Sequence, residues 1–357
     1  VTEHYTKLRD KAMTYNEFLE MILKKLTKFN NDSTIIENEL KQLQEMSSVD
    51  EKSIDSLMRV LQDVVQYRKK IQPAFEDCMI LGNELVNRKD VTDSYVVKDK
   101  VKRLQTLWES LDRRLDEKLR LTKQKSEKLA AFEISKQEIL LWIAEMEAKT
   151  AFFMPVALDL SIIRQQADEH KLLVNEYKEY HRVIQRINDI GAEYDSLLRT
   201  SSPIMNNAVD RQDLTDLTSM QQELQEINHR YNFIGVRLAD RQKDLDDTRA
   251  IVTRQKENLE ALNAFLDKIE KNLPKFNLTV RENAEKCIKH VRKQQDEMFE
   301  KQSTMEMTKG QIQEILLAKP QVPGASNLKN ELDSLLNRWQ TIADLLKNAA
   351  LTSERSL

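Results

Sequence analysis

The histidines and cysteines are the residues with most potential for chemistry, and their spacing predicts no catalytic or metal site. His170 and His181 share one predicted helix with no third ligand at helical spacing, so we expect a cap or an interhelical hydrogen bond. Cys78 and Cys287 lie far apart and form no metal or redox pair. Cys78 falls on an apolar stripe and is predicted to lie in the core. Cys287 has a more polar context and could react, but no neighbouring residue suggests activation of its thiol.

The sequence contains no motif for nucleotide binding, phosphate binding, serine hydrolysis or zinc proteolysis, and its five glycines are scattered singly. We therefore expect no catalytic residue, no cofactor-binding or metal site, and no enzyme activity. The tryptophans could stack on a ligand, but their helical spacing predicts that they belong to the core.

The composition favours long helices whose outer faces are charged and exposed to solvent. Charged residues make up 32% of the 357 residues, aromatic residues 6%, and there are only 5 Gly and 6 Pro. Lys and Arg number 56 against 59 Asp and Glu, and this near balance argues against nucleic-acid binding. No apolar run approaches the ~18 residues of a membrane span, and the cysteine usage suits a reducing compartment, so we expect a cytoplasmic chain without direct membrane insertion. The first residue is Val1, already in a helical pattern, which predicts a segment of a longer protein.

Two stretches without helix breakers organise the chain. Neither Gly nor Pro occurs between Gly82 and Pro155, and apolar residues there step by three and four from Val101 to Met146. We expect one continuous helix of roughly 80 Å at ~1.5 Å per residue. The stretch 209–273, which only Gly235 interrupts, is likewise predicted to form one continuous helix. Each long helix is predicted to close one bundle and open the next.

Three sets of residues recur at matching offsets and reveal three copies of one unit. They are Trp108, Tyr231 and Trp339; Phe18, Trp142 and Phe265; and Gly82, Gly191 and Gly310. The first two sets are predicted aromatic core anchors. Each copy reads as three helices, and the copies span residues 1–122, 123–248 and 249–357. The expected helices cover residues 1–30, 52–90, 92–122, 123–151, 157–199, 206–248, 249–272, 277–318 and 325–349.

Turn chemistry agrees with most of these helix ends. The stretch 30–33 (Asn-Asn-Asp-Ser), Pro155, the stretch 201–203 (Ser-Ser-Pro) and the stretch 320–324 are predicted loops or caps. Pro73 falls inside a predicted helix and should kink or divide it.

The pattern resembles the spectrin repeat over essentially the whole chain. His170, Leu173 and Glu176, followed by Ile184, Ile187, Ile190 and Gly191, look like its second helix. The run from Phe132 to Trp142 is similar to its first helix, and Leu332, Leu335, Arg338 and Trp339 resemble its third. The resemblance implies an all-α fold of tandem left-handed three-helix coiled coils, joined by continuous helices into an elongated rod. A long parallel coiled-coil dimer is a rival that the turn signals disfavour, so we expect a monomeric rod.

The second copy departs from the others in a way that predicts a partner site. The spacing from glycine to aromatic anchor is 26 residues in the first copy, 40 in the second and 29 in the third. About two extra heptads therefore lie between Ser196 and Thr218, and an insertion of whole heptads keeps the stripe in phase. Apolar residues beside a turn are candidates for exposure. The predicted partner-binding residues are Ser201, Pro203, Ile204 and Met205, with extra residues 35–46 of the first copy as the next candidate.

Two classes of function remain open on the sequence. The first is a non-catalytic rod segment of a giant cytoskeletal linker, acting as spacer, tension-bearing element and docking scaffold. The second is a membrane-binding helical scaffold, and the basic segment 112–128 is either a solvated helix face or a contact for actin or acidic lipid.

The irregular Lys/Glu-rich repeats look most like those of giant nesprins, with plakin and dystrophin-type rods as alternatives. A nesprin resemblance implies a cytoplasmic rod at the cytosolic face of the outer nuclear membrane, linked to actin. It also implies protein partners among actin regulators such as a formin.

Overall fold

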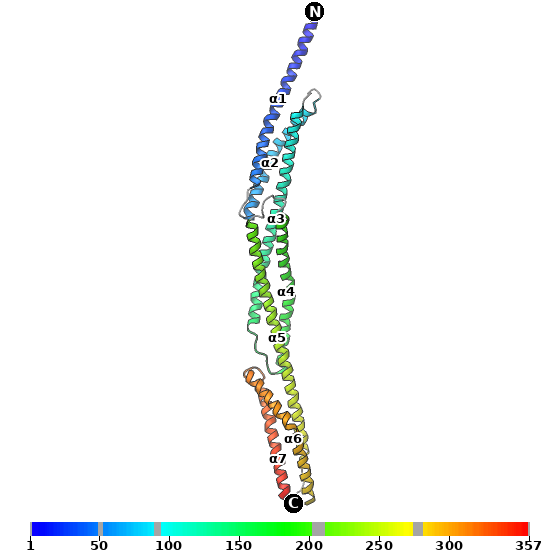
Figure 1. Ribbon diagram of the computed structural model, residues 1–357, viewed down its shortest axis with the longest axis vertical. Helices are drawn as coiled ribbons and strands as arrows, with labels where there is room; N and C mark the ends of the chain where they lie inside the picture. Colours follow the sequence, from blue (N-terminus) through cyan, green and yellow to red (C-terminus); the bar gives the residue numbers. More distant parts are fainter. Residues whose placement is uncertain (1, 49–52, 89–93, 202–210, 274–280, 356–357) are drawn as a thin grey trace. The chain divides into compact units, whose positions relative to one another are not determined.

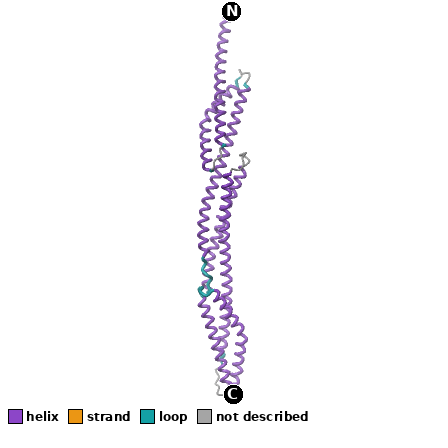
Figure 2. The backbone as a smooth tube through the Cα atoms, turned by 60° about the vertical axis from the view of Figure 1, so that its left-hand side comes forward, coloured by secondary structure: helices purple, strands orange, loops and turns teal. Residues whose placement is uncertain are grey.

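The computed structural model describes residues 2–48, 53–88, 94–201, 211–273 and 281–355. Over these residues it contains seven α-helices and no strand, which confirms the all-α prediction (Figures 1 and 2). The helices are α1 (Thr2–Ser47), α2 (Ile54–Val86), α3 (Tyr95–Ala151), α4 (Leu160–Ser201), α5 (Arg211–Lys271), α6 (Arg281–Ala318) and α7 (Ala325–Arg355).

The two long helices predicted from the lack of Gly and Pro are confirmed. Helix α3 has 57 residues and α5 has 61, and Gly235 does not interrupt α5. Their apolar stripes are buried along most of their lengths, from Val101 to Met146 in α3 and from Met220 to Ile269 in α5. Packing of an amphipathic face stabilises helices far beyond what intrinsic propensity provides.

The predicted loop at residues 30–33 is wrong, because α1 runs through it to Ser47. Ser33 lies on the buried stripe of α1, and its hydroxyl donates to the Asn30 carbonyl oxygen at 2.9 Å. Ile36, Leu40 and Leu43 continue that stripe at steps of four and three, and all are at most 4% exposed. A sustained apolar period outweighs four residues with turn propensity.

Helix α2 is not divided at Pro73, so of the two expected outcomes, a kink or a division, the division does not occur. Pro73 is exposed, and the helix continues through it from Ile54 to Val86. The apolar residues that follow it, Phe75 and Cys78, are buried in the same core as those that precede it, Leu61 and Val64. Burial on both sides holds the helix together in spite of the lost backbone hydrogen bond.

The chain divides into two compact units. The first comprises Val1–Ile139 and Ile184–Glu226, and the second comprises Leu140–Val183 and Ile227–Leu357. The predicted division into repeats at 122/123 and 248/249 remains a prediction.

In the first unit, α1, α2 and the start of α3 share one core. Its fully or nearly fully buried members include Phe29, Leu43, Leu61, Val64, Leu104 and Leu115. Gly82 allows a close approach of these helices, because a Cβ there would lie 2.5 Å from Val101 Cγ2 and 2.6 Å from Phe29 Cε2. Further along α3, Lys136 pairs with Glu223 of α5, and Lys128 pairs with Glu193 of α4.

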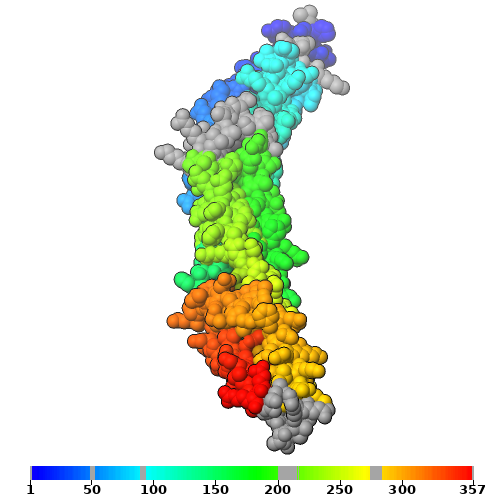
Figure 3. Space-filling view, turned by 60° about the horizontal axis from the view of Figure 1, so that its bottom comes forward, coloured from blue at the N-terminus to red at the C-terminus, as the bar shows by residue number. Residues whose placement is uncertain are grey.

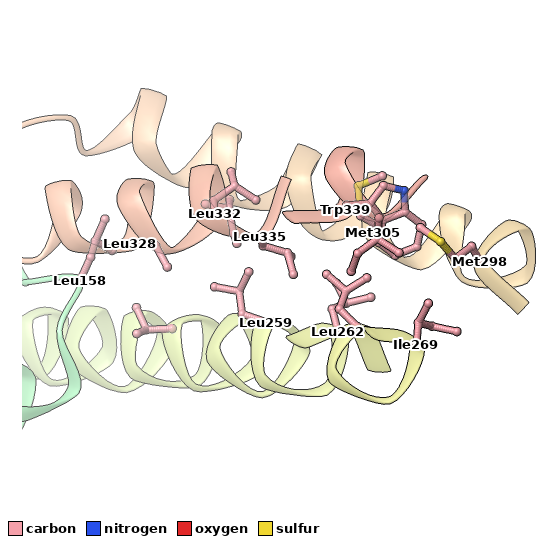
Figure 4. Close-up of a cluster of buried hydrophobic side chains, with 14 of the residues drawn as sticks. Leu158, Leu259, Leu262, Ile269, Met298, Met305, Leu328, Leu332, Leu335 and Trp339 are labelled. Atoms are coloured by element: carbon pink, nitrogen blue, oxygen red, sulfur yellow. The ribbon is translucent and has the colours of Figure 1, made fainter. Parts of the chain in front are cut away.

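In the second unit, the C-terminal half of α5 packs with α6 and α7. Figure 3 shows α6 and α7, coloured orange to red, against the yellow part of α5. Figure 4 shows Leu259, Leu262 and Ile269 of α5 facing Leu335 and Trp339 of α7, with α6 supplying methionines. The repeat of apolar residues every three or four positions therefore builds a three-helix core here.

Candidate interaction surfaces

The predicted partner-binding residues fall at the edge of, or outside, the described part of the chain. Ser201 is the last residue of α4, while Pro203, Ile204 and Met205 lie in 202–210, outside the described residues. Their role stays a prediction. The second candidate, residues 35–46, forms the packed half of α1, with Ile36, Leu40 and Leu43 buried and Ile35 59% exposed.

The anchors of the first unit differ in their surroundings. Trp108 of α3 stacks on Phe75 of α2, with ring centroids 4.3 Å apart and planes 12° from parallel. Phe18 of α1 is half-buried, and its ring lies 6.2 Å from that of Tyr15 and 5.2 Å from the guanidinium of Arg88. Phe18 thus lies at the border of the packed part of α1.

An aromatic layer joins α3, α4 and α5 in the second unit. Trp142 stacks on Tyr180 at 3.8 Å, and Tyr177 stacks on Tyr231 at 4.3 Å. The Tyr231 hydroxyl donates to the Tyr177 carbonyl oxygen at 2.9 Å, and Trp142 Nε1 donates to Glu176 at 3.1 Å. Burial raises the pKa of Tyr231 well above its ordinary value. Stacked rings with satisfied polar tips are the arrangement of a structural core rather than of an open ligand site.

Two arginines hold helix pairs together at the rim of the core. Arg230 of α5 donates two hydrogen bonds to the Glu147 carboxylate of α3, at 2.9 and 2.7 Å, and this lowers the pKa of Glu147. Arg338 of α7 pairs with Glu270 and with Asp267 of α5, which raises the pKa of Arg338. Bidentate arginine pairs of this kind fix the register of neighbouring helices.

The remaining anchors lie beside Arg338. The ring of Phe265 on α5 is 6.1 Å from that of Trp339 on α7, and Trp339 is 9% exposed. These residues occupy positions on the stripes that also bury Leu262 and Leu335.

A buried histidine and arginine form a polar site, of which the sequence analysis singled out His170 but not Arg241. His170 of α4 is 2% exposed, makes no hydrogen bond of normal geometry, and lies edge-on to Phe153 at 5.9 Å. The guanidinium of Arg241 lies 5.2 Å from the same ring, and Arg241 is 9% exposed. Burial and then Arg241 lower the pKa of His170. A backbone hydrogen bond with Leu238 of α5 acts on the pKa in the opposite direction, so the expected interhelical hydrogen bond at His170 stays a prediction. His181 is exposed, 6.0 Å from the Tyr231 ring.

The position of Arg241 in the apolar repeat of α5 could have predicted that it is buried. It falls on the buried stripe of α5 between Leu238 and Leu245, at steps of three and four. Lys125 of α3 is 8% exposed and lies three positions after Thr122, which is also buried. Counting positions would have placed both in the interior despite their charge.

Both cysteines are buried, Cys78 at 1% and Cys287 at 2% exposure. The predicted core position of Cys78 is confirmed, and burial raises its pKa to about 11. The polar surroundings expected for Cys287 are wrong, because the residue belongs to the α5–α6–α7 core. Polar neighbours in sequence occupy the outer face of α6 and do not surround the thiol.

Two loops of the second unit meet at Gly324. The Leu158 amide donates to the Pro323 carbonyl oxygen at 2.8 Å, and Gly324 has φ +88°. A Cβ at Gly324 would lie 2.8 Å from the backbone of both Leu158 and Asp159. Only glycine combines the left-handed conformation with this approach.

Several residues of the basic segment 112–128 form ion pairs within the molecule. Arg68 of α2 pairs with Asp112 and, at 3.5 Å, with Asp116. Arg120 pairs with Glu117 one turn away. Such pairs favour a solvated helix face over a free basic surface, although each contributes little to stability.

Within the described residues, no group of three or more His, Cys, Asp or Glu is placed to hold a metal ion. The search of the same residues finds no helix with the length and hydropathy of a membrane span. Of the residues selected for chemistry, His170, Cys78 and Cys287 are buried in packed cores, whereas His181 is exposed.

Comparison with known proteins gives distant relatives among cytoskeletal proteins. The chain is similar to microtubule-actin cross-linking factor 1 of Rattus norvegicus, with 21% identity over 341 residues that cover 91% of this chain and 6% of that protein. It is also similar to isoforms 6/7 of microtubule-actin cross-linking factor 1 of Homo sapiens, with 20% identity over 307 residues covering 84% and 8%. The chain therefore spans less than a tenth of the length of these relatives, and no family model matches it.

Proposed function

We propose that this chain is a non-catalytic rod segment of a large cytoskeletal linker protein. The observation that carries the proposal is the burial of one apolar stripe along most of α3 and of another along α5. A helix that contributes to a core at both of its ends transmits force along its axis without a flexible joint, because its backbone hydrogen bonds run parallel to that axis. Distant similarity to cytoskeletal cross-linking factors over 91% of the chain supports the same class.

In this role the segment spaces other domains, bears tension and offers docking faces to protein partners. Ion pairs between helices support tension bearing: Arg338 joins α7 to α5 through Glu270, and Arg230 joins α5 to α3 through Glu147. The relatives are named as cross-linkers of microtubules and actin, and we propose actin-associated partners, including actin regulators such as a formin.

The finer assignment that we propose is a nesprin-type parent, with plakin and dystrophin-type parents as alternatives. It rests on the irregular Lys/Glu-rich repeats and would place the rod in the cytoplasm, at the cytosolic face of the outer nuclear membrane. The predicted partner surface around Ser201, Pro203, Ile204 and Met205 remains part of this proposal.

Stretching a single molecule between residues 2 and 355 tests the tension-bearing role. We expect unfolding in discrete, reversible steps, because separate helical cores open one at a time. Gradual extension without steps, as from a chain lacking packed cores, would refute the role.

Vesicle sedimentation separates this function from a membrane-binding scaffold. We expect no binding to vesicles rich in phosphatidylserine at physiological ionic strength, since Arg120, Lys123 and Lys128 of segment 112–128 each pair with a carboxylate of the chain. Salt-sensitive binding to these vesicles would favour the scaffold. Parallel sedimentation with actin filaments, with and without a purified formin, tests the proposed partners.

A further inference from the structure

The side of α3 that points away from the core is apolar and exposed over the C-terminal part of the helix. Ile134 and Leu141 are 62% and 74% exposed, and Phe152, directly after the end of α3, is 90% exposed. Leu141 lies two positions from both Ile139 and Ile143, which are fully buried, so at about 3.6 residues per turn it points about 200° away from each of them. Large apolar side chains thus occupy the side of α3 opposite to the core.

The two most outward positions of each heptad of α3 change character at residue 130. In the preceding part of the helix these positions are charged and exposed: Arg113, Asp116, Arg120, Lys123 and Glu127. From residue 130 onward the same positions, again exposed, carry Ala130, Ile134, Gln137, Leu141, Ala144, Ala148 and Ala151. We call these seven residues the α3 face. A helix face in contact with water normally carries polar residues, so this series is unusual for a solvated face.

The adjacent helix α4 shows the usual pattern on its outer side. Leu172 is an exposed apolar residue there, but the other outward positions are polar and exposed: Gln165, Asp168, Asn175, Glu179, Arg182, Arg186 and Asp189. Helices α3 and α4 pack on each other through the stacked rings of Trp142 and Tyr180, so both contribute to the same core. Formation of that core therefore does not account for the apolar character of the α3 face.

The sizes of the side chains fit a second helix lying along α3. Ala144, Ala148 and Ala151 form a shallow stretch between the larger Leu141 and Phe152. The distance between packed helices depends on the side chains at their contact, and small side chains permit a close approach. The steps of three and four within the α3 face are those of a coiled-coil seam, whose partner is an α-helix with a matching apolar stripe.

Carboxylates border the α3 face on both sides, with Glu133 and Glu147 on one side and Glu138 and Glu145 on the other. Lys136 is shared between Glu133 at 2.8 Å and Glu223 of α5 at 3.0 Å. Lys149 is shared between Glu145 at 2.9 Å and Glu176 of α4 at 3.4 Å, and Arg230 of α5 pairs with Glu147. Each lysine thus serves two carboxylates, and the border of the α3 face keeps an excess of negative charge.

We propose that the α3 face is a docking surface for an amphipathic α-helix of a partner protein, whose apolar stripe is bordered by Lys or Arg. Apolar contact along the stripe supplies the affinity, and pairing of the partner's cations with Glu133, Glu138 and Glu145 selects the partner. A second copy of this chain is disfavoured as the occupant, because carboxylates would then border both sides of the contact. An anionic bilayer is disfavoured for the same reason.

This inference deepens the proposed docking role and rests on it, but it concerns a surface different from the one predicted around Ser201. Peptide binding and single-molecule stretching test the two roles separately. A chain that unfolds in steps but binds no peptide remains a tension-bearing rod and loses this docking surface.

Two designed peptides test the proposal with the full 357-residue chain. Both are cross-linked so that they remain helical, and both carry leucine and alanine along one stripe with steps of three and four. One peptide has lysine at every bordering position, and the other has glutamate there. Fluorescence anisotropy should show saturable binding of the lysine peptide, at least ~tenfold tighter than that of the glutamate peptide.

Matched variants locate the binding surface. Ile134→Gln combined with Leu141→Gln removes apolar area without changing charge, and it should weaken binding of the lysine peptide by at least ~tenfold. Ile80→Gln combined with Leu317→Gln is the control, because these residues of α2 and α6 are 66% and 82% exposed and lie outside the α3 face, so binding should remain unchanged. All four positions are exposed, and thermal unfolding followed by circular dichroism should give the same midpoint for both variants and the parent.

Charge reversal at the border tests the selectivity. Glu138→Lys combined with Glu145→Lys should invert the preference, so that the glutamate peptide binds more tightly than the lysine peptide. An unchanged preference in this variant would overturn the proposal.

Other outcomes would overturn it as well. They are equal binding of both peptides by the parent chain, binding of neither, loss of binding in the control variant, and undiminished binding when Ile134 and Leu141 are replaced by Gln. Sedimentation equilibrium showing a dimer that this last variant abolishes would identify a second copy as the occupant. Binding to phosphatidylserine vesicles that the same variant abolishes would identify a membrane contact instead.

Discussion

Gly310 and Gly324 both belong to the second unit, but their surroundings differ: Gly310 is exposed on α6, and Gly324 lies in the turn before α7. Gly310 is in α6 with no atom within 4 Å of a Cβ built on it, whereas Gly324 has φ +88° and touches the backbone of another loop. Gly310→Ala should raise the unfolding free energy by about 0.5–1 kcal/mol through helix propensity. Gly324→Ala should lower it by more than ~1 kcal/mol, because the native conformation is incompatible with a Cβ.

Urea titration of the two variants measures this difference. Midpoints that shift in the same direction would show that the loop contact between Leu158 and Pro323 is not a fixed feature in solution.

Trp339 tests the core of α5, α6 and α7. It is 9% exposed and lies beside Phe265, so Trp339→Ala should cost about 3–5 kcal/mol, the range for truncating a large buried aromatic residue. Phe299 of α6 is 77% exposed, and Phe299→Ala should stay within ~0.5 kcal/mol of the parent. Similar denaturant midpoints for the two variants would mean that Trp339 does not lie on the buried face of α7.

His170 predicts a dependence of stability on pH. Burial lowers its pKa in the folded state, so the unfolded state, with a pKa of about 6.5, binds a proton first as pH falls. The contribution of His170 to stability is thus complete above the unfolded pKa and is lost below it, at no more than ~1.4 kcal/mol per pH unit. Protonation in place would also set a cation beside Arg241.

Unfolding free energies between pH 7.5 and 5.5 check this expectation. His170→Leu should flatten the profile relative to the parent, whereas the same change at exposed His181 should leave the slope intact. A parent profile that is already flat in this window contradicts a buried neutral histidine.

At the scale of elements, α3 is the clearest case for a helix with two roles. Lys125 lies in its interior and is 8% exposed. Lys125→Pro should cost at least ~3 kcal/mol by removing a backbone hydrogen bond, and it should split one thermal transition into two. Lys125→Ala keeps the helix and controls for loss of the side chain. A single transition with unchanged midpoint in the proline variant would show that continuity of α3 does not couple the cores.

The long helices could be predicted from sequence because the signal is simple: long runs without Gly or Pro that carry a sustained apolar period. The end of α1 could not, because residues 30–33 combine turn propensity with an intact stripe, and packing of Ser33 and Ile36 decides between them. Gly82, Gly191 and Gly310 align in sequence, yet only the first two allow a close approach of side chains. Such differences depend on distances between helices, which spacing alone does not fix.

Candidate sites were harder to predict than elements. The aromatic anchors stood out by type and spacing, but the buried pair of His170 and Arg241 did not, because charged residues normally lie outside.

At the scale of the whole molecule, the account requires that tandem cores joined by α3 and α5 make a rod. Helix α5 alone, with 61 residues, is ~90 Å long at ~1.5 Å per residue. A compact domain of 357 residues would instead have a radius of gyration of about 21 Å. The rod and the compact domain therefore differ in size by far more than the error of a measurement in solution.

Small-angle X-ray scattering of the 357-residue chain, with the mass checked by sedimentation equilibrium, is the most direct measurement. We predict a monomer with a maximum dimension well above ~90 Å and a radius of gyration far above ~21 Å. A particle shorter than α5 alone, or a radius of gyration near that of a compact domain, would contradict the rod.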